Sequence, residues 1–176
     1  FRDTPERMRL WSEVGGAVDY YFFLGENLDE VIGAYRKLTG PAPMLPRWAY
    51  GYWQSKERYR SQHEIIGVVQ EYRRRKVPLD VIVQDWQYWG EHGWNAIEFD
   101  RRYFPDPPAM IDSIHALDAH YLISVWPVFD STTAVFKDFA RRGLLCVKPD
   151  GEVTRLYDAY NPEARARYWE SVSYTH

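Results

Sequence analysis

One stretch of the chain, residues 79–90 (LDVIVQDWQYWG), ends an apolar run on a carboxylate and follows it at once with aromatic side chains. The run has the length of a strand, so the sequence predicts a buried strand that ends at Asp85. A carboxylate there can accept hydrogen bonds from two neighbouring hydroxyls, and aromatic faces can cover the C–H faces of a pyranose. The stretch therefore predicts a surface that binds a saccharide. The alternative is that Asp85 caps the next turn and that the rings belong to the core.

The high aromatic content also favours a ligand with apolar faces and polar edges, such as a saccharide. The chain has 176 residues, of which 45% are hydrophobic and 17% aromatic, including eight Trp and fourteen Tyr. This length predicts roughly one domain. A net charge of −3 and a pI near 6.0 provide no attraction for a phosphate backbone, so no nucleic-acid partner is expected.

Cysteine and histidine usage indicates no further chemistry. Cys146 is the single cysteine, which excludes a disulfide within the chain. No metal site is expected, because zinc ligation needs closely paired ligands on one face and four histidines lack that spacing: His63, His92, His115 and His120. No apolar run approaches the length of a membrane span, so no membrane partner is expected. The compartment and the oligomeric state stay undetermined.

The N-terminal part of the sequence predicts extended structure followed by a helix. Residues 11–24 contain two runs of strand-forming residues around Gly15-Gly16, which predicts a hairpin or a sheet edge. Asn27 then offers an N-cap with Glu30 three residues later, and Gly40 can end the helix. The prolines in residues 41–46 cannot continue that helix, so they mark a boundary between two parts of the chain.

Beyond this boundary, strand and helix patterns alternate. Ser61, Asp106 and Asn161 are predicted helix starts, and the basic residues 73–76 are interpreted as the solvated last turn of a helix. The expected strands are 48–53, 81–85 and 121–126, and the expected helices follow Ser61, follow Asp106, cover 135–142 and run from Asn161 toward Trp169.

Such alternation predicts βαβ units around a parallel sheet, in a doubly wound fold or in a barrel. The Gly-rich turn of a nucleotide-binding doubly wound fold is missing, because residues 54–58 (QSKER) follow the first strand. The long aromatic loop after the second strand favours a barrel, whose sites are built at the carboxyl ends of the strands. Asp85 and Trp126 both fall there.

Several separated segments, in order, resemble glycoside hydrolase family 31, the α-glucosidase and α-xylosidase group. The resemblance runs from about Trp11 to Trp169, and the pattern YWG at 88–90 with GW at 93–94 is most similar to the bacterial α-xylosidase branch. The segments are 45–54 (LPRWAYGYWQ), 85–90 (DWQYWG), 99–100 (FD), 104–107 (FPDP) and 124–127 (SVWP).

The resemblance implies an α/β fold, a (β/α)8 TIM barrel preceded by a β-sandwich domain. Residues 1–40 are then the end of the sandwich and a connecting helix, and residues 41–176 are the first three to four βα units of the barrel. Members of this family hydrolyse α-glycosidic bonds at the non-reducing end with retention. They use an aspartate nucleophile and an aspartate acid/base, whose carboxyl groups must lie about 5 Å apart. No cofactor is implied.

Neither catalytic aspartate is expected among these residues. The family's nucleophile lies in a Trp-x-Asp-x-x-Glu type segment after the fourth barrel strand, and no Trp in this sequence has Asp two residues later. We therefore expect a barrel truncated before that strand, so that the chain alone is inactive. The alternative is a carbohydrate-binding or structural module that never carried these acids. The sequence that follows His176 in the gene would distinguish the two.

The resemblance carries over only the substrate-binding wall. Asp85 matches the carboxylate that binds hydroxyls of the terminal sugar in the −1 subsite, and Trp126 matches a position that lines the same subsite. Trp86 occupies a variable position linked to the choice between sugars with and without a hydroxymethyl group. Arg58, or its neighbour Tyr59, falls where some members place a lid residue. The expected partner is an α-linked oligosaccharide, whereas Trp53 and Trp94 are interpreted as barrel packing.

Overall fold

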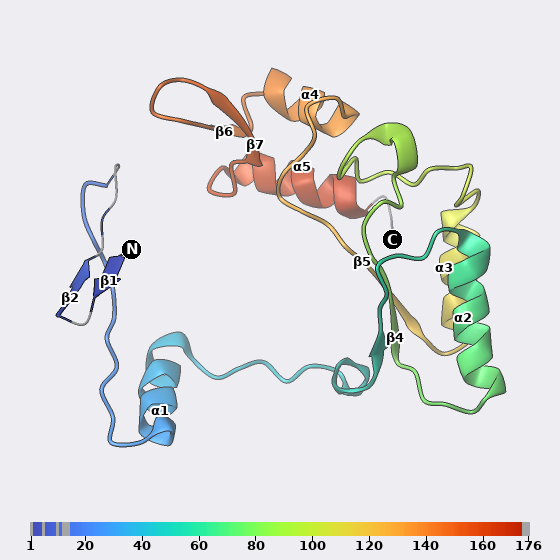
Figure 1. Cartoon of the computed structure of the whole chain (residues 1–176), viewed down its shortest axis with the longest axis horizontal. Helices are drawn as coiled ribbons and strands as arrows, with labels where there is room; N and C mark the ends of the chain where they lie inside the picture. The colour runs from blue at the N-terminus through green and yellow to red at the C-terminus, as the bar shows by residue number, and fades with distance from the viewer. Residues whose placement is uncertain (1, 5, 10, 12–14, 174–176) are drawn as a thin grey trace. The chain divides into compact units, whose positions relative to one another are not determined.

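The structure is a computed structural model that describes residues 2–4, 6–9, 11 and 15–173. It divides into two compact units, Phe1–Met44 and Leu45–His176, each of which is described by itself. Figure 1 shows the elements of both units along the chain.

The first unit contains an antiparallel pair of short strands and one helix. Strands β1 (Arg2–Thr4) and β2 (Arg7–Arg9) pair with each other, and helix α1 covers Leu28–Thr39. The predicted ends of α1 are confirmed: the Asn27 side chain accepts a hydrogen bond from the Glu30 amide at 3.0 Å, and Gly40 ends the helix with φ of 81°. Such a positive φ is available to glycine at little cost.

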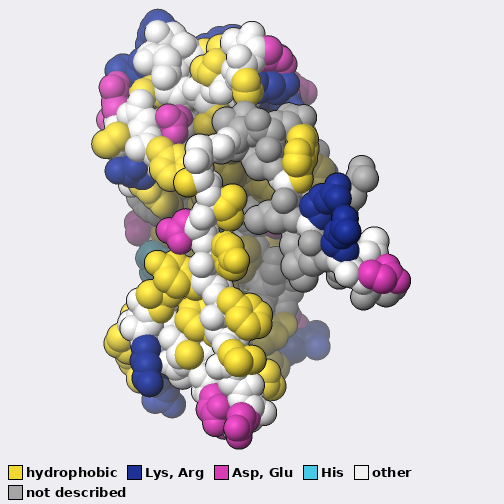
Figure 2. Space-filling view, turned by 90° about the vertical axis from the view of Figure 1, so that its left-hand side faces the viewer, with side chains coloured by type: hydrophobic (Ala, Val, Ile, Leu, Met, Phe, Trp, Pro, Cys, Tyr) yellow, Lys and Arg dark blue, Asp and Glu magenta, His cyan; other side chains and the backbone are white. Residues whose placement is uncertain are grey.

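The expected strand within residues 11–24 is wrong for the residues described. Residues 17–25 form no strand, and the large side chains of this segment are mostly exposed, with Phe22 at 81% and Leu24 at 84%. Strand-forming residues are not sufficient, because a strand also needs a neighbour with which to exchange backbone hydrogen bonds. Residues 12–14, which fall within the predicted hairpin, lie outside the described part of the chain. Figure 2 shows hydrophobic side chains gathered on one face of the molecule.

The second unit is built on a three-stranded parallel sheet. Its strands are β3 (Trp53–Gln54), β4 (Val81–Gln84) and β5 (His120–Ile123), paired in the order of the sequence. The connections carry helix α2 (Gln62–Arg74) and helix α3 (Pro107–Ala116), which lie side by side against the sheet (Figure 1). Consecutive parallel strands joined by helices are the arrangement that the sequence predicts.

The two connecting helices begin where the sequence predicts. The Ser61 hydroxyl accepts from the Glu64 amide at 3.1 Å, and the Asp106 carboxylate accepts from the Ala109 amide at 3.1 Å. Each side chain satisfies an amide that has no partner inside its helix.

The predicted strand at 48–53 is only partly correct. Arg47–Tyr50 form a 3₁₀ helix, closed by hydrogen bonds from the Ala49 amide to Pro46 and from the Gly51 amide to Trp48, and the strand begins at Trp53. The chain then pairs with β4 through Trp53 and Gln54.

The rest of the second unit includes a hairpin that the sequence reasoning missed. Helix α4 (Ala134–Arg141) and helix α5 (Pro162–Ser173) match the predicted helices, but strands β6 (Leu145–Val147) and β7 (Val153–Tyr157) pair antiparallel between them.

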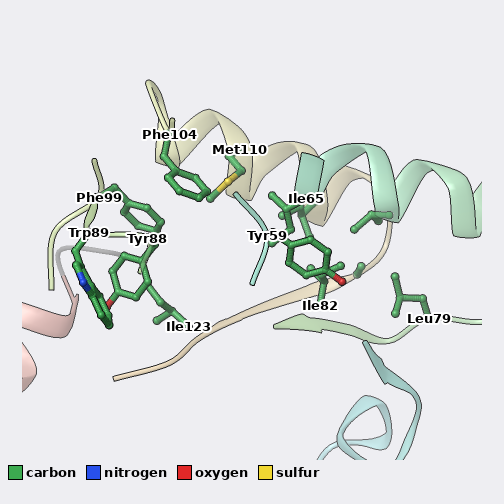
Figure 3. Packing of buried hydrophobic residues seen from close by; sticks show 13 residues of the cluster. Tyr59, Ile65, Leu79, Ile82, Tyr88, Trp89, Phe99, Phe104, Met110 and Ile123 are labelled. Atoms are coloured by element: carbon green, nitrogen blue, oxygen red, sulfur yellow. The ribbon is translucent and has the colours of Figure 1, made fainter. Parts of the chain in front are cut away.

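Two clusters of buried residues support these elements. The larger lies between the sheet, α2, α3 and the long segment after β4, where Tyr88, Trp89, Phe99 and Phe104 pack together (Figure 3). The second lies under α4, α5 and the hairpin and is centred on Phe129 and Phe139. The rings of segment 86–99 thus belong largely to the core, as the alternative interpretation of the opening stretch supposes.

Candidate substrate-binding rim

The carboxyl ends of β4 and β5 lie next to each other and carry the candidate site. The strands pair in parallel through Gln84 and Ile123, and the Ser124 amide donates to the Gln84 carbonyl at 3.0 Å. Asp85 and the segment that leads to Trp126 therefore leave the sheet at the same end, the carboxyl ends of the strands. Barrel enzymes assemble their sites at this end.

Asp85 follows a residue that is firmly held. The Gln84 side chain is fully buried, and its amide donates to the carbonyls of Tyr59 at 3.1 Å and Asp85 at 3.2 Å. The Asp85 side chain is half-buried, and the hydrogen bond recorded for it among the described residues runs from the Trp86 amide to Oδ1 at 2.8 Å. That contact agrees with a turn-capping role but engages one carboxylate oxygen only.

Arg58 and Trp86 are brought together although they lie 28 residues apart. The Arg58 guanidinium carbon lies 5.5 Å from the centroid of the Trp86 ring, a cation–π contact, and Arg58 also hydrogen-bonds the Gln87 side chain. Gln87 has φ of 63°, which turns the chain sharply just after Trp86. Tyr59, the alternative position for a lid residue, is 2% exposed and belongs to the core, whereas Arg58 is half-buried.

Trp126 is half-exposed at 48%, while its backbone is fixed from two sides. Its amide donates to Asn95 Oδ1 at 3.2 Å, and its carbonyl accepts from Asn95 Nδ2 at 2.7 Å and from the Tyr168 hydroxyl at 3.3 Å. The Trp94 ring lies 5.6 Å from the Trp126 ring and packs against the larger core cluster. An exposed ring on a fixed backbone can cover the apolar face of a ligand.

Asn95 was not among the residues selected from the sequence. Its partners lie 31 and 33 residues further along the chain, so no local pattern indicates the contact. Trp53, interpreted as packing, is 40% exposed, with its ring 6.3 Å from that of Trp48.

The segment between β4 and α3 contains an ion pair between Arg102 and Asp100. Arg102 contacts Asp100 at 2.6 Å, and these hydrogen bonds lower the pKa of the buried Asp100 carboxyl to about 2, in spite of its burial. Asp100 therefore stays ionised at neutral pH and serves the loop as an anchor. It also lies close to Gly90, where an added Cβ would come within 2.0 Å of Asp100 Oδ2.

Neither a metal-binding cluster nor a membrane-spanning helix is found among the described residues. Within them, no group of three or more His, Cys, Asp or Glu side chains is arranged to hold a metal ion. In the same part of the chain, no helix has the length and apolar character that crossing a membrane requires.

Comparisons with known proteins agree with this geometry. Residues 42–176 match the family model described as the Glycosyl hydrolases family 31 TIM-barrel domain. The chain is 49% identical over 166 residues to an α-xylosidase of Saccharolobus solfataricus, covering 94% of this chain and 22% of that protein. It is 32% identical to α-glucosidase 2 of Bacillus thermoamyloliquefaciens, covering 81% of this chain and 18% of that protein.

Solved structures give the same result. The α-xylosidase of Xanthomonas citri superposes with a TM-score of 0.69 at 42% identity, over 85% of this chain and 17% of the other. A soil-metagenome α-xylosidase in complex with xylose gives 0.73 at 35% identity, over 86% and 23%. The chain thus spans about a fifth of the length of these relatives. With a parallel α/β sheet and a family model that covers most of its residues, the chain belongs to glycoside hydrolase family 31 and forms part of its TIM-barrel domain.

Proposed function

We propose that this chain is the first part of the catalytic barrel of a retaining α-glycoside hydrolase that removes terminal sugars from the non-reducing end of α-linked oligosaccharides. The observation that carries the proposal is that Asp85 and Trp86 follow β4, and Trp126 follows β5, at the carboxyl ends of two paired parallel strands, in a chain that belongs to family 31. An α-xyloside is the favoured substrate, because the relatives named above include α-xylosidases at 49% and 42% identity.

In this proposal, each rim residue has its own role. Asp85 accepts hydrogen bonds from two hydroxyls of the terminal sugar; this role is supported by a half-buried carboxylate whose hydrogen bond to the Trp86 amide engages Oδ1 alone. Trp126 covers an apolar face of the sugar, and Trp86, held by Arg58, limits the space beside it. The nucleophile and the acid/base lie on later strands of the barrel. Residues 1–40 belong to the end of a preceding β-sandwich and its connecting helix, and residues 41–176 to the barrel.

The test is Asp85→Ala in the protein that continues this chain through the rest of the barrel. Loss of charge-assisted hydrogen bonds, worth roughly 1.5–3 kcal/mol each, should lower kcat/KM for an aryl α-xyloside by about 10² to 10⁴. The melting temperature should change little, since a residue on the open rim contributes little to packing.

Asp80 provides the matched control. It precedes the same strand at its opposite end, where Oδ2 accepts from the Tyr52 amide at 2.9 Å. Asp80→Ala should lower the melting temperature and leave kcat/KM near the original value. If Asp85→Ala behaves like Asp80→Ala instead, Asp85 is a turn cap and does not bind the substrate. A protein with no α-glycosidase activity at all would support the alternative of a non-catalytic module.

A further inference from the structure

Asn95 stands out among the buried polar residues because its side chain hydrogen-bonds the main chain of a segment more than 30 residues further along the sequence. It is fully buried and has φ of 55°, a conformation that asparagine tolerates better than most residues. Its side-chain amide both donates to and accepts from the main chain of Trp126, and it donates a second time to the Val128 carbonyl at 2.7 Å. Three hydrogen bonds thus fix the chain at residues 126–128.

The chemistry of these partners allows only an amide. Two carbonyls face Nδ2 and one amide N–H faces Oδ1, so the side chain must offer two donors and one acceptor. Aspartate has the same size but would turn both donors into acceptors against the carbonyls of Trp126 and Val128. At this buried position a carboxylate oxygen would then face carbonyl oxygens without a hydrogen, which costs more free energy than the lost hydrogen bonds were worth.

Contacts of the neighbouring residue Trp94 extend this connection from the backbone of Trp126 to its side chain. The Trp94 carbonyl accepts from the Asp130 amide at 3.1 Å, and the Trp94 ring lies 5.6 Å from the Trp126 ring. The dipeptide Trp94-Asn95, from the loop after β4, therefore holds both the backbone and the ring of Trp126, from the loop after β5. The Tyr168 hydroxyl of α5 contributes one more hydrogen bond to the Trp126 carbonyl, at 3.3 Å.

We propose that Asn95 is a positioning residue for substrate binding, which sets the orientation of Trp126 at the rim through its side-chain amide. The inference rests on the proposed function, in which Trp126 covers a face of the terminal sugar. It assigns to Asn95 an effect on substrate binding that acts through Trp126 and is separate from its contribution to stability.

A double-mutant cycle in the complete enzyme separates the two effects. Asn95→Asp should lower kcat/KM for an aryl α-xyloside by about 10-fold to 100-fold, mainly through a higher KM. Trp126→Ala should lower it at least as much. The double variant should be no worse in kcat/KM than Trp126→Ala alone, because Asn95 has nothing left to orient. Melting temperatures should fall further in the double variant than in either single one.

Two further variants keep the proposal testable if Asn95→Asp folds poorly. Tyr168→Phe removes one hydrogen bond to the Trp126 carbonyl, and it should raise KM by a few-fold only when Trp126 is present. Asp100→Asn is the control, because it weakens the anchor to Arg102 without any recorded contact to segment 124–133. It should lower the melting temperature and leave KM unchanged.

The outcomes are distinct. If Trp126→Ala lowers kcat/KM but Asn95→Asp and Tyr168→Phe do not, the positioning role is overturned and the proposed function stands. If the kinetic losses of Asn95→Asp and Trp126→Ala simply add, Asn95 acts on the fold and not through Trp126, which also overturns the proposal. If Trp126→Ala has normal kinetics, the assignment of Trp126 to the sugar wall fails together with the inference.

Discussion

The backbone and the ring of Trp86 are each held by a neighbouring side chain. Asp85 Oδ1 accepts from the Trp86 amide, and Arg58 lies over the ring at 5.5 Å. In the proposed site, a large side chain held this way would leave a fixed amount of space beside the sugar. Hexoses carry a hydroxymethyl group that pentoses lack, and a rigid wall at that place would exclude it.

Trp86→Ala should therefore widen the substrate range of the complete enzyme. We expect the ratio of kcat/KM for an aryl α-glucoside to that for an aryl α-xyloside to rise by about 10-fold or more, even if both values fall. Steady-state kinetics on the two substrates measures this ratio. Trp48→Ala is the control, because Trp48 stacks on His120 at the other end of β5, at 4.1 Å between centroids. An unchanged ratio in Trp86→Ala would remove Trp86 from the choice of sugar.

In helix α2, the contacts of Arg73 correct the interpretation of the basic residues 73–76 as a solvated last turn. Arg74 and Arg75 are exposed and contact Glu71, as a solvated last turn would. Arg73 instead points to the loops that precede β4 and β5. Its guanidinium donates to the carbonyls of Leu117 at 2.6 Å, Leu79 at 2.8 Å and Asp118 at 2.8 Å. The planar guanidinium can bind several carbonyls at once, which lysine cannot reproduce.

Arg73→Ala should destabilise the barrel by about 2 kcal/mol, since it leaves carbonyls of two loops without their charged donor. Arg74→Ala, one position further along the same helix, should have little effect because its ion pair with Glu71 is exposed. Chemical denaturation of the complete protein compares the two variants. Equal stability of both would show that the solvated interpretation holds for Arg73 as well.

Helices α4 and α5 are joined by an ion-pair network around Asp138. Its carboxylate contacts Arg167 of α5 at 2.9 Å, Arg141 of its own helix at 2.5 Å and the C-cap residue Arg142 at 3.1 Å. Partial burial would raise the pKa of Asp138, but the hydrogen bonds from these three arginines outweigh it and hold the pKa at about 2. The unfolded chain has the ordinary, higher pKa and so binds the proton first as the pH falls.

This network predicts a specific acid sensitivity. The stabilisation by Asp138, about 1–2 kcal/mol, should be complete above about pH 4 and disappear as the pH falls toward 2. Asp138→Asn should therefore lower the melting temperature at pH 6 and show a shallower decline between pH 4 and 2 than the original protein. Parallel pH profiles of the two proteins would contradict this assignment.

The sequence predicted the elements whose signals are local. Asn27, Ser61 and Asp106 cap their helices as expected, because each cap bonds an amide only three residues away. A strand was predicted wrongly at 18–24 and the hairpin β6–β7 was missed for the opposite reason, since strand formation depends on a partner elsewhere in the chain. The same applies at the rim: Asp85 and Trp86 are visible as a motif, whereas Asn95 becomes significant only when Trp126 is placed beside it.

In the second unit, the described sheet has strands with an unpaired side and large side chains that are partly exposed. Among the described strands, β3 and β5 each pair with one neighbour only, so each has a second edge available for pairing. Large side chains such as Leu122 and Trp169, at 38% and 57%, are partly exposed. In the proposed full barrel, later strands and helices would cover these surfaces and bring the two catalytic carboxylates to the rim.

Residues 1–176 expressed alone should therefore hydrolyse neither aryl α-xylosides nor aryl α-glucosides. Binding residues cannot form a glycosyl-enzyme intermediate without the nucleophile and the acid/base. Release of the aryl group by the purified polypeptide, with host glycosidases excluded by a mock purification, is the measurement. Turnover above that background would mean that the catalytic carboxylates are already present in this sequence.

The attachment of Trp94-Asn95 to residues 126–130 also limits how this barrel can be recombined with related ones. Exchange of single βα modules between homologues assumes that each loop depends on its own strand and helix. Here the loop after β4 and the loop after β5 share hydrogen bonds from the buried Asn95 side chain and a contact between two tryptophan rings. The two loops must therefore be exchanged together. A crossover between residues 96 and 124 would separate Asn95 from its acceptors, whereas a crossover before Val81 would transfer the pair intact.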